Sequence, residues 1–271
     1  MRIIKERVKM KRIFVAIILL SLIVNCFAGQ KTEKLAEELL KSTVKVFGHF
    51  IEEDVMFDDE LSWSGTGVII EETKNEYTIV TNLHVLGFWA IYNADATSGP
   101  EVISYSLMVK MYDGKTAKIS KVLINEDLKD FALIKIEKSV GDYPAKPLQS
   151  KMPAVGESVY AMGHPMGLDY SFTAGIISGQ RMFKSDLGKE FVMLQTDTPI
   201  NSGNSGGPLV DDKGGLIGIN TSGIAKSRAE GLNFAIWSSE ILQSQINNEF
   251  IEFPLSSPRK IGLFVEMMKS K

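Results

Sequence analysis

The chain has 271 residues, of which 44% are hydrophobic and 23% are charged, and its formal net charge at pH 7 is −3. This composition is that of a globular protein with a sizeable core, and it excludes wholesale disorder and a fibrous repeat. A single cysteine excludes an intramolecular disulfide framework and a metal site built on several cysteines. The negative net charge gives no support to a nucleic-acid-binding function.

The first 28 residues differ in charge from the rest. Residues 1–12 carry six basic side chains and one acidic one, a net of +5, which leaves −8 for the remainder. An uncharged run of 12 residues, Ile13 to Val24, follows. It is short for a membrane span but has the length of a signal-peptide core, so residues 1–28 are predicted to be an export signal starting at Met1 or Met10.

The end of this signal allows two interpretations. Cys26-Phe27-Ala28 before Gly29 offers a signal-peptidase site, which would release a secreted or periplasmic protein. Ile23-Val24-Asn25-Cys26 resembles a loose bacterial lipobox, which would attach a lipid to Cys26 and anchor the protein in the cell envelope. Membrane contact is expected only through this signal or this lipid.

Residues 31–42 have helical periodicity, and we assign 29–43 to an N-terminal helix. Short apolar runs between Gly, Asn and Asp turns then predict an all-β protein with two β-barrels. The predicted strands are 44–51, 66–71, 77–81, 105–111, 117–124, 131–136, 157–162, 172–179, 190–195, 208–210 and 215–221.

A Pro- and Gly-containing connector at 141–154 separates two β halves, assigned to residues 44–148 and 149–248. Residues 237–248 are predicted to be a second helix, and 249–271 a C-terminal tail. The acidic segment 52–60 is predicted to be a solvated loop, with calcium binding as the alternative, and the irregular segment 87–104 receives no assignment.

The first candidate for chemistry is Ser205, in Asn201-Ser-Gly-Asn-Ser-Gly-Gly-Pro208. Three glycines suit a tight turn whose backbone N–H groups face a ligand, which would make Ser205 a nucleophile beside an oxyanion hole. The alternative is a Gly-rich hairpin. A serine nucleophile needs a base, and the chain has only three histidines.

Among the histidines, His84 follows a strand pattern that ends in Thr81-Asn-Leu-His, a rigid place for a base. His164, in a Gly-His-Pro-Met-Gly turn, is predicted to lie at the surface, and His49, within a strand pattern, to be structural. The base needs an acid to orient it, and Asp130 precedes the buried-strand pattern Phe131-Ala-Leu-Ile-Lys-Ile136.

Two other acids compete with Asp130. Asp127 is predicted to be a turn residue, and Asp197 a hydrogen-bonding group below the Ser205 loop. The order of the candidates then separates two folds. Gly203-Asn-Ser-Gly-Gly207 also fits the α/β-hydrolase elbow, but no histidine follows Ser205, whereas His84, Asp130, Ser205 is the chymotrypsin order.

Seven stretches in family order make the chain similar to the protease domain of bacterial HtrA (Deg) proteins, which are trypsin-like, chymotrypsin-fold serine proteases. They are Gly65-Thr-Gly-Val-Ile-Ile70, Thr81-Asn-Leu-His-Val85, Asp130-Phe-Ala-Leu-Ile-Lys135, Thr173-Ala-Gly-Ile-Ile-Ser178, Gln195 to Leu209, Gly218-Ile-Asn-Thr221 and Gly231-Leu-Asn-Phe-Ala-Ile236.

The resemblance implies two antiparallel six-stranded β-barrels with the active site between them. It implies that His84 is the base, Asp130 the acid that orients it, and Ser205 the nucleophile. The oxyanion hole would lie in the stretch Gly203-Asn204-Ser205, formed by the backbone N–H groups of Gly203 and Ser205. It also implies a protein-quality-control endopeptidase acting on unfolded or secreted polypeptides, without metal or organic cofactor. Because such relatives are often trimers, it allows a homotrimer.

The sequence departs from the family in two respects. Only 35 residues follow Ile236, too few for the PDZ domain that usually follows the protease, so activation through a PDZ domain is not expected within this chain. His164 also stands where the family often has asparagine. A chaperone-like or peptide-binding module of the same fold with little proteolysis is the alternative function.

Substrate preference is predicted from Pro199, six residues before Ser205, where enzymes that cut after Lys or Arg carry an aspartate. With Ile200 and Ile219 beside it, we expect an apolar pocket that takes Val, Ala, Ile or Leu, because burying an unpaired cation is costly. Asn220 and Thr221 are expected to continue an edge that pairs with the extended substrate.

Overall fold

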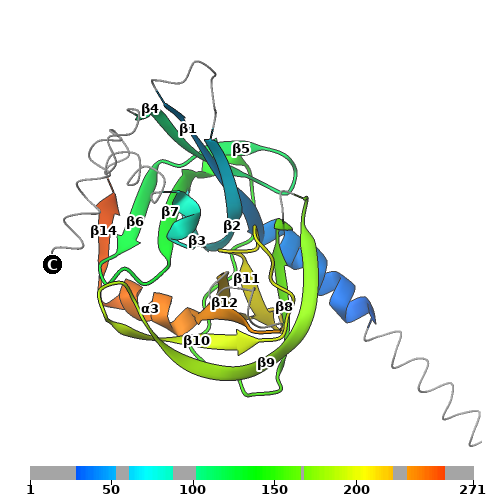
Figure 1. Cartoon of the computed structure of the whole chain (residues 1–271). Helices are drawn as coiled ribbons and strands as arrows, with labels where there is room; N and C mark the ends of the chain where they lie inside the picture. Colours follow the sequence, from blue (N-terminus) through cyan, green and yellow to red (C-terminus); the bar gives the residue numbers. More distant parts are fainter. Residues whose placement is uncertain (1–28, 53–60, 88–101, 166–167, 222–230, 254–271) are drawn as a thin grey trace, which may run out of the picture. The chain divides into compact units, whose positions relative to one another are not determined.

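Antiparallel strands dominate the part of the chain that the structure, a computed structural model, describes: residues 29–52, 61–87, 102–165, 168–221 and 231–253 (Figure 1). The predicted export signal with Cys26, most of the acidic segment 52–60, residues 88–101 and the end of the predicted tail lie outside these ranges. From Leu39 onward the chain forms one unit, which holds both sheets.

The first sheet has eight strands in the order β14-β6-β7-β3-β2-β1-β4-β5. Its strands are β1 (Thr43–Glu52), β2 (Leu61–Glu72), β3 (Glu76–Thr81), β4 (Val102–Lys110), β5 (Thr116–Lys118), β6 (Lys121–Asn125), β7 (Ala132–Glu137) and β14 (Phe250–Phe253). It curls around a core of β-branched and aromatic side chains that includes Val46, Ile79 and Ile134, all fully buried. Such residues pack well on a pleated surface, which explains why these runs become strands.

The second sheet is a closed barrel of six strands in the order β10-β13-β12-β11-β8-β9, which leaves it no open edge. Its strands are β8 (Ser158–Gly163), β9 (Ser171–Lys184), β10 (Glu190–Thr196), β11 (Pro208–Asp211), β12 (Leu216–Thr221) and β13 (Asn233–Trp237). A separate core cluster fills this barrel. The helix α3 (Ser238–Ile246) follows β13, and the short turns η1 (His84–Leu86) and η2 (Lys138–Val140) follow β3 and β7.

The all-β prediction is confirmed, but three elements differ from expectation. The run predicted as one strand, 117–124, is β5 and β6, because Ile119 N–H bonds to Leu107 in β4 whereas Ser120 N–H bonds to Lys135 in β7. The chain therefore changes its pairing partner between residues 119 and 120, from β4 to β7. The strands β13 and β14 were not predicted, and both are short runs: β13 pairs with β10 and β12, and β14 pairs with the distant β6.

The predicted tail also needs correction at its start. Residues 250–253 form β14, which pairs with β6 and so returns the chain from the second barrel to the first sheet. The first sheet consequently has eight strands rather than six, and the two halves are not consecutive segments of sequence.

Residues 29–42 are helical, so the helix begins two residues before the periodic run 31–42. The helix ends where the hydroxyls of Ser42 and Thr43 both donate to the carbonyl of Leu39, at 3.1 and 2.7 Å. These bonds satisfy an acceptor that the helix end leaves open. Within the described ranges, no helix has the length and apolar character needed to cross a membrane.

Candidate active site

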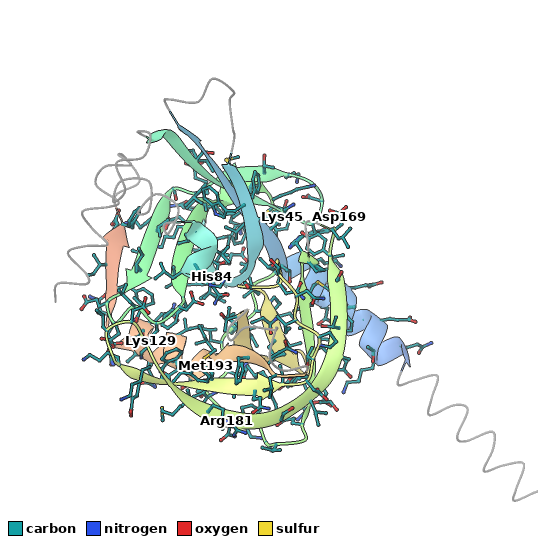
Figure 2. All side chains as sticks on the ribbon, in the orientation of Figure 1. Lys45, His84, Lys129, Asp169, Arg181 and Met193 are labelled. Atoms are coloured by element: carbon teal, nitrogen blue, oxygen red, sulfur yellow. The ribbon has the colours of Figure 1, made fainter. Side chains whose placement is uncertain are left out.

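His84 lies in η1, immediately after β3, between the first sheet and the second barrel in the view of Figure 2. The turn is held by its surroundings: Trp63 Nε1 donates to the Val85 carbonyl at 2.9 Å, and Gly87 N–H bonds to the His84 carbonyl at 3.2 Å. Gly87 has φ of 72°, a conformation that glycine adopts without steric cost. The imidazole is therefore mounted on a fixed turn at the end of a buried strand.

Asp130 lies just before β7 and contacts both the ring and the backbone of His84. The two carboxylate oxygens are 3.0 and 2.9 Å from His84 Nδ1, and Oδ1 also accepts the His84 backbone N–H at 3.1 Å. Asn82 Nδ2 donates to the Asp130 carbonyl at 2.8 Å, which holds the loop from the end of β3. The acid is thus tied to both the backbone and the ring of the histidine.

Two opposing effects act on the pKa of His84. Burial of the ring lowers the pKa, but the hydrogen bond and the negative charge of Asp130 outweigh it, so the pKa of His84 lies above 6.5. Part of the ring remains accessible, with 42% of the side chain exposed. An imidazole with one nitrogen fixed by a carboxylate and an accessible edge can take and return a proton.

Ser205 lies in two successive turns. Asn204 N–H bonds to the Asn201 carbonyl, and Gly207 N–H bonds to the Asn204 carbonyl, both at 2.9 Å. The third residue of the first turn is Gly203, with φ of 96°, and that of the second is Gly206, with φ of 83°. Positive φ at this position is typical of turns that require glycine, so the glycines noted in the sequence have a conformational reason.

The Ser205 loop packs against the segment that carries His84. A Cβ added at Gly206 would lie 2.4 Å from Thr81 Oγ1 and 3.1 Å from Asn82 N, and one added at Gly65 would meet Val85 at 2.6 Å and the Ser205 carbonyl at 3.2 Å. Only glycine allows these approaches. Residues from the two sheets thus meet where the chain order predicts a shared site.

The predicted specificity residues are not all arranged as expected. Ile200 is 2% exposed and belongs to the core cluster of the second barrel, and Ile219 is also buried. Pro199 is exposed, and its carbonyl accepts from Thr173 Oγ1 at 3.1 Å. Asn204 is buried with its side chain directed at Gly163, where an added Cβ would meet Asn204 Oδ1 at 2.6 Å.

The prediction that the backbone of Asn220 pairs with an extended substrate is wrong, because its N–H and its carbonyl are both hydrogen-bonded within the protein. Its N–H donates to the Gly207 carbonyl and its carbonyl accepts from Gly206 N–H, both at 2.8 Å. Thr221 has a contact that the sequence did not indicate: its Oγ1 donates to Asp130 Oδ2 at 2.9 Å. A hydroxyl 91 residues from the acid has no sequence signal that would identify it as a partner.

The competing acids are bound elsewhere. Asp197 Oδ1 accepts the Ile176 N–H of β9 at 2.7 Å, the hydrogen-bonding role expected for it. Asp127 lies 3.8 Å from Lys189 Nζ and the chain turns beside it, where Leu128 N–H bonds to the Asn125 carbonyl.

The surface position predicted for His164 is wrong. The residue is 2% exposed, and its ring lies 4.2 Å from that of Tyr170 between centroids. Burial, with a smaller contribution from Lys45, lowers the pKa of His164 to about 4. Leu168 N–H bonds to the Pro165 carbonyl, so the chain turns just after His164 as the Gly-Pro pattern indicated, but His164 itself is buried. His49 lies in β1, where it pairs with Ser62 and Ser106.

Comparison with known proteins agrees with this geometry. Residues 65–219 match the family described as "Trypsin-like peptidase domain". The chain is 34% identical over 190 residues to "Serine protease Do-like HtrA" of Bacillus subtilis, covering 68% of this chain and 39% of that protein. It is 35% identical over 191 residues to "Probable periplasmic serine protease do/HhoA-like" of Haemophilus influenzae, covering 70% of this chain and 37% of the relative.

A solved structure titled "Crystal structure of Deg5" superposes with a TM-score of 0.58 at 29% identity, covering 79% of this chain and 92% of that one. The chain therefore spans about two fifths of the length of these two curated relatives and nearly all of a structural one.

Proposed function

The chain belongs to the trypsin-like peptidase family, among its HtrA/Deg serine proteases, and from this premise we propose that it is an exported serine endopeptidase. The observation that carries the proposal is the hydrogen-bonded pair His84–Asp130, together with the packing of the Ser205 glycine turns against Thr81 and Asn82, just before His84. A peptidase of this kind uses a serine, a histidine and a carboxylate acting together.

In the proposed reaction Ser205 Oγ attacks the carbonyl carbon of the peptide bond while His84 Nε2 takes its proton. The bond to the leaving amine breaks as His84 returns that proton, and water then releases the acyl group by the same route. Asp130 holds Nδ1 protonated and stabilises the imidazolium that forms. The raised pKa of His84 supports this role, because it reflects the stabilisation of the charged ring by Asp130.

The backbone N–H groups of Gly203 and Ser205 are proposed to bind the oxyanion of the tetrahedral intermediate. Fixed N–H groups stabilise developing charge without reorganisation during the reaction. The two successive glycine turns support this assignment, because they hold the backbone on both sides of Ser205.

We propose an apolar pocket for the residue before the cleaved bond. Pro199 cannot neutralise a cation, and Asp197, the nearest acid in sequence, is bonded to the backbone of β9. Polypeptide substrates, export and a location in the periplasm or cell envelope are part of the same proposal, supported by the signal-like residues 1–28 and by relatives named periplasmic.

The proposal is tested by labelling the purified protein with a fluorophosphonate probe and mapping the modified residue by mass spectrometry. We expect Ser205 to be labelled, unfolded casein to be cleaved, and Ser205→Ala to lose both, with Ser202→Ala as the matched control. A protein that binds casein without cleaving it, and that no probe labels, would instead be a chaperone-like module of the same fold.

A further inference from the structure

Thr66, in β2, bonds to two residues of the Ser205 loop at once. Its Oγ1 donates to the Gly203 carbonyl at 2.6 Å, and its backbone N–H donates to the Ser205 carbonyl at 2.8 Å. The Thr66 carbonyl in turn accepts from Thr81 Oγ1 at 2.7 Å. Thr66 is completely buried, so water does not compete with these bonds. One residue of the first sheet therefore holds the loop on both sides of Asn204.

These bonds determine the planes of the peptides around Ser205. The peptide from Gly203 to Asn204 is bonded at its carbonyl by Thr66 and at its N–H by Asn201. The peptide after Ser205 is bonded at its carbonyl by Thr66 N–H and at its N–H by the Asn220 carbonyl. Between them lies the peptide that carries the Ser205 N–H. Rotation of the first peptide would break the short Thr66 bond, so the hydroxyl opposes loss of the loop conformation.

His164 holds the Thr66 hydroxyl in place. The His164 backbone N–H donates to Thr66 Oγ1 at 3.1 Å, and His164 Nδ1 lies 3.2 Å from the same oxygen. The single hydroxyl proton of Thr66 is directed at Gly203, the shorter contact, so Nδ1 must be the donor in the second. This assigns the Nδ1–H tautomer to His164. The threonine oxygen then accepts two hydrogen bonds and donates one, which fixes its rotamer.

We propose that Thr66, held by His164, is a positioning residue that maintains the oxyanion-binding conformation of the Ser205 loop. The inference rests on the proposed function, since it assigns a role within the same site. Thr66 does not touch the reacting atoms; it acts through the backbone of Gly203 and Ser205. Its effect should consequently appear in the chemical step rather than in substrate binding.

The test compares Thr66→Ala with Thr66→Ser, two variants that differ only in the hydroxyl. Alanine is chosen over valine because a methyl group would be pressed against the Gly203 carbonyl, 2.6 Å from the present oxygen. Initial rates on fluorescein-labelled casein give kcat and KM, and the rate of fluorophosphonate labelling of Ser205 gives an independent measure. Thr78→Ala is the matched control, because Thr78 is another buried threonine, whose hydroxyl bonds to Glu71.

We expect Thr66→Ala to lower kcat and the labelling rate by about 10- to 100-fold with KM nearly unchanged, less than the ~10²–10³-fold cost of removing an oxyanion donor itself. Thr66→Ser and Thr78→Ala should stay within a few-fold of the wild type. Equal kcat values for folded Thr66→Ala and Thr66→Ser would overturn the inference.

Circular dichroism and thermal melting establish that each variant is folded. Should Thr66→Ala not fold, His164→Ala gives the second comparison, because it removes the Nδ1–H donor to Thr66 Oγ1 and leaves Thr66 in place. A smaller loss of kcat and labelling rate is expected, and rates equal to those of the wild type would overturn the inference. A wild-type protein that neither cleaves casein nor reacts with the probe contradicts the proposed function itself, an outcome distinct from a failure confined to the Thr66 variants.

Discussion

Thr221 and Asp130, 91 residues apart in sequence, are joined by a hydrogen bond of 2.9 Å from the threonine hydroxyl to carboxylate oxygen Oδ2. The same oxygen lies 2.9 Å from His84 Nδ1. Asp130 precedes β7 of the first sheet, whereas Thr221 ends β12 of the second barrel. The second barrel therefore helps to orient the acid that orients the histidine of the first sheet.

Replacement of this threonine should weaken catalysis without abolishing it. Thr221→Val removes one of the donors to the Asp130 carboxylate, and hydrogen bonds to charged groups contribute about 1.5–3 kcal/mol. We expect kcat on casein to fall about tenfold, because Asp130 keeps its bonds to His84, and Thr221→Ser to restore most of the activity. A kcat for Thr221→Val equal to that of the wild type would show that this bond does not matter to the reaction.

Asp130→Asn should lower kcat by about 10⁴-fold while the protein remains folded, because an amide stabilises the wrong imidazole tautomer. Asp127→Asn is the matched control, since Asp127 faces Lys189 at 3.8 Å and not His84. Steady-state kinetics on casein and circular dichroism measure the two effects. The reverse order of losses would assign the orienting role to Asp127.

The value of kcat/KM should rise with pH as His84 loses its proton, since only the neutral ring accepts the Ser205 proton. Because Asp130 holds the pKa of His84 above its ordinary value of 6.5, despite the opposing effect of burial, the midpoint of this rise should lie above pH 6.5. Rates on labelled casein between pH 5 and about 9 give the profile. A midpoint below 6.5, with chemistry rate-limiting, contradicts the environment described for this ring.

His164 should make folding stability depend on pH in the opposite direction to His84. Its folded pKa of about 4 lies below the unfolded value of 6.5, because burial and the cations Lys45 and Lys110 outweigh the nearby Asp169. The unfolded chain therefore binds a proton first as the pH falls. Stability is fully present above pH 6.5 and decreases towards pH 4, by about 3 kcal/mol at most.

The variant His164→Asn tests this dependence, because its amide can donate to Thr66 but does not titrate. Urea unfolding at pH 7 and at pH 4.5 should show a smaller loss of stability for the variant than for the wild type. His84 and the carboxylates are common to both proteins and cancel in the difference. Equal losses would indicate that His164 is protonated in the folded protein.

Cleavage should occur after small or branched apolar residues. Pro199 is uncharged and the Asp197 carboxylate is bonded to the backbone of β9, so among the described residues we place no acid at the proposed pocket. One methylene more or less in an apolar pocket changes the discrimination between substrates by only about 1–3 kcal/mol. The preference should therefore be broad among Val, Ala, Ile and Leu. Mass spectrometry of casein fragments checks it, and predominant cuts after Lys and Arg would be the contrary result.

The sequence alone predicted most of the β architecture, because alternating apolar runs between turn residues carry a local signal. It also identified His84, Asp130 and Ser205 as candidates: glycine turns, a strand end and chain order are all readable from neighbouring residues. The structure brings His84 and Asp130 into contact and packs the Ser205 loop against the segment that leads into His84. The two strands β13 and β14 were not predicted, because runs of five and four residues carry little periodic signal, and β14 also pairs with β6, far along the chain.

Only the tertiary structure decided which polar groups support these candidates. Thr66 and Thr221 lie in stretches that match the family and His164 lies in a Gly-Pro turn, but nothing near them in the chain indicates a bond to Gly203 or Asp130. A hydroxyl or imidazole acquires its role from the groups packed against it, and for these three residues those groups are 91 to 137 positions away. Local pattern determines strands and turns, whereas burial and long-range hydrogen bonds determine which side chains orient the chemistry.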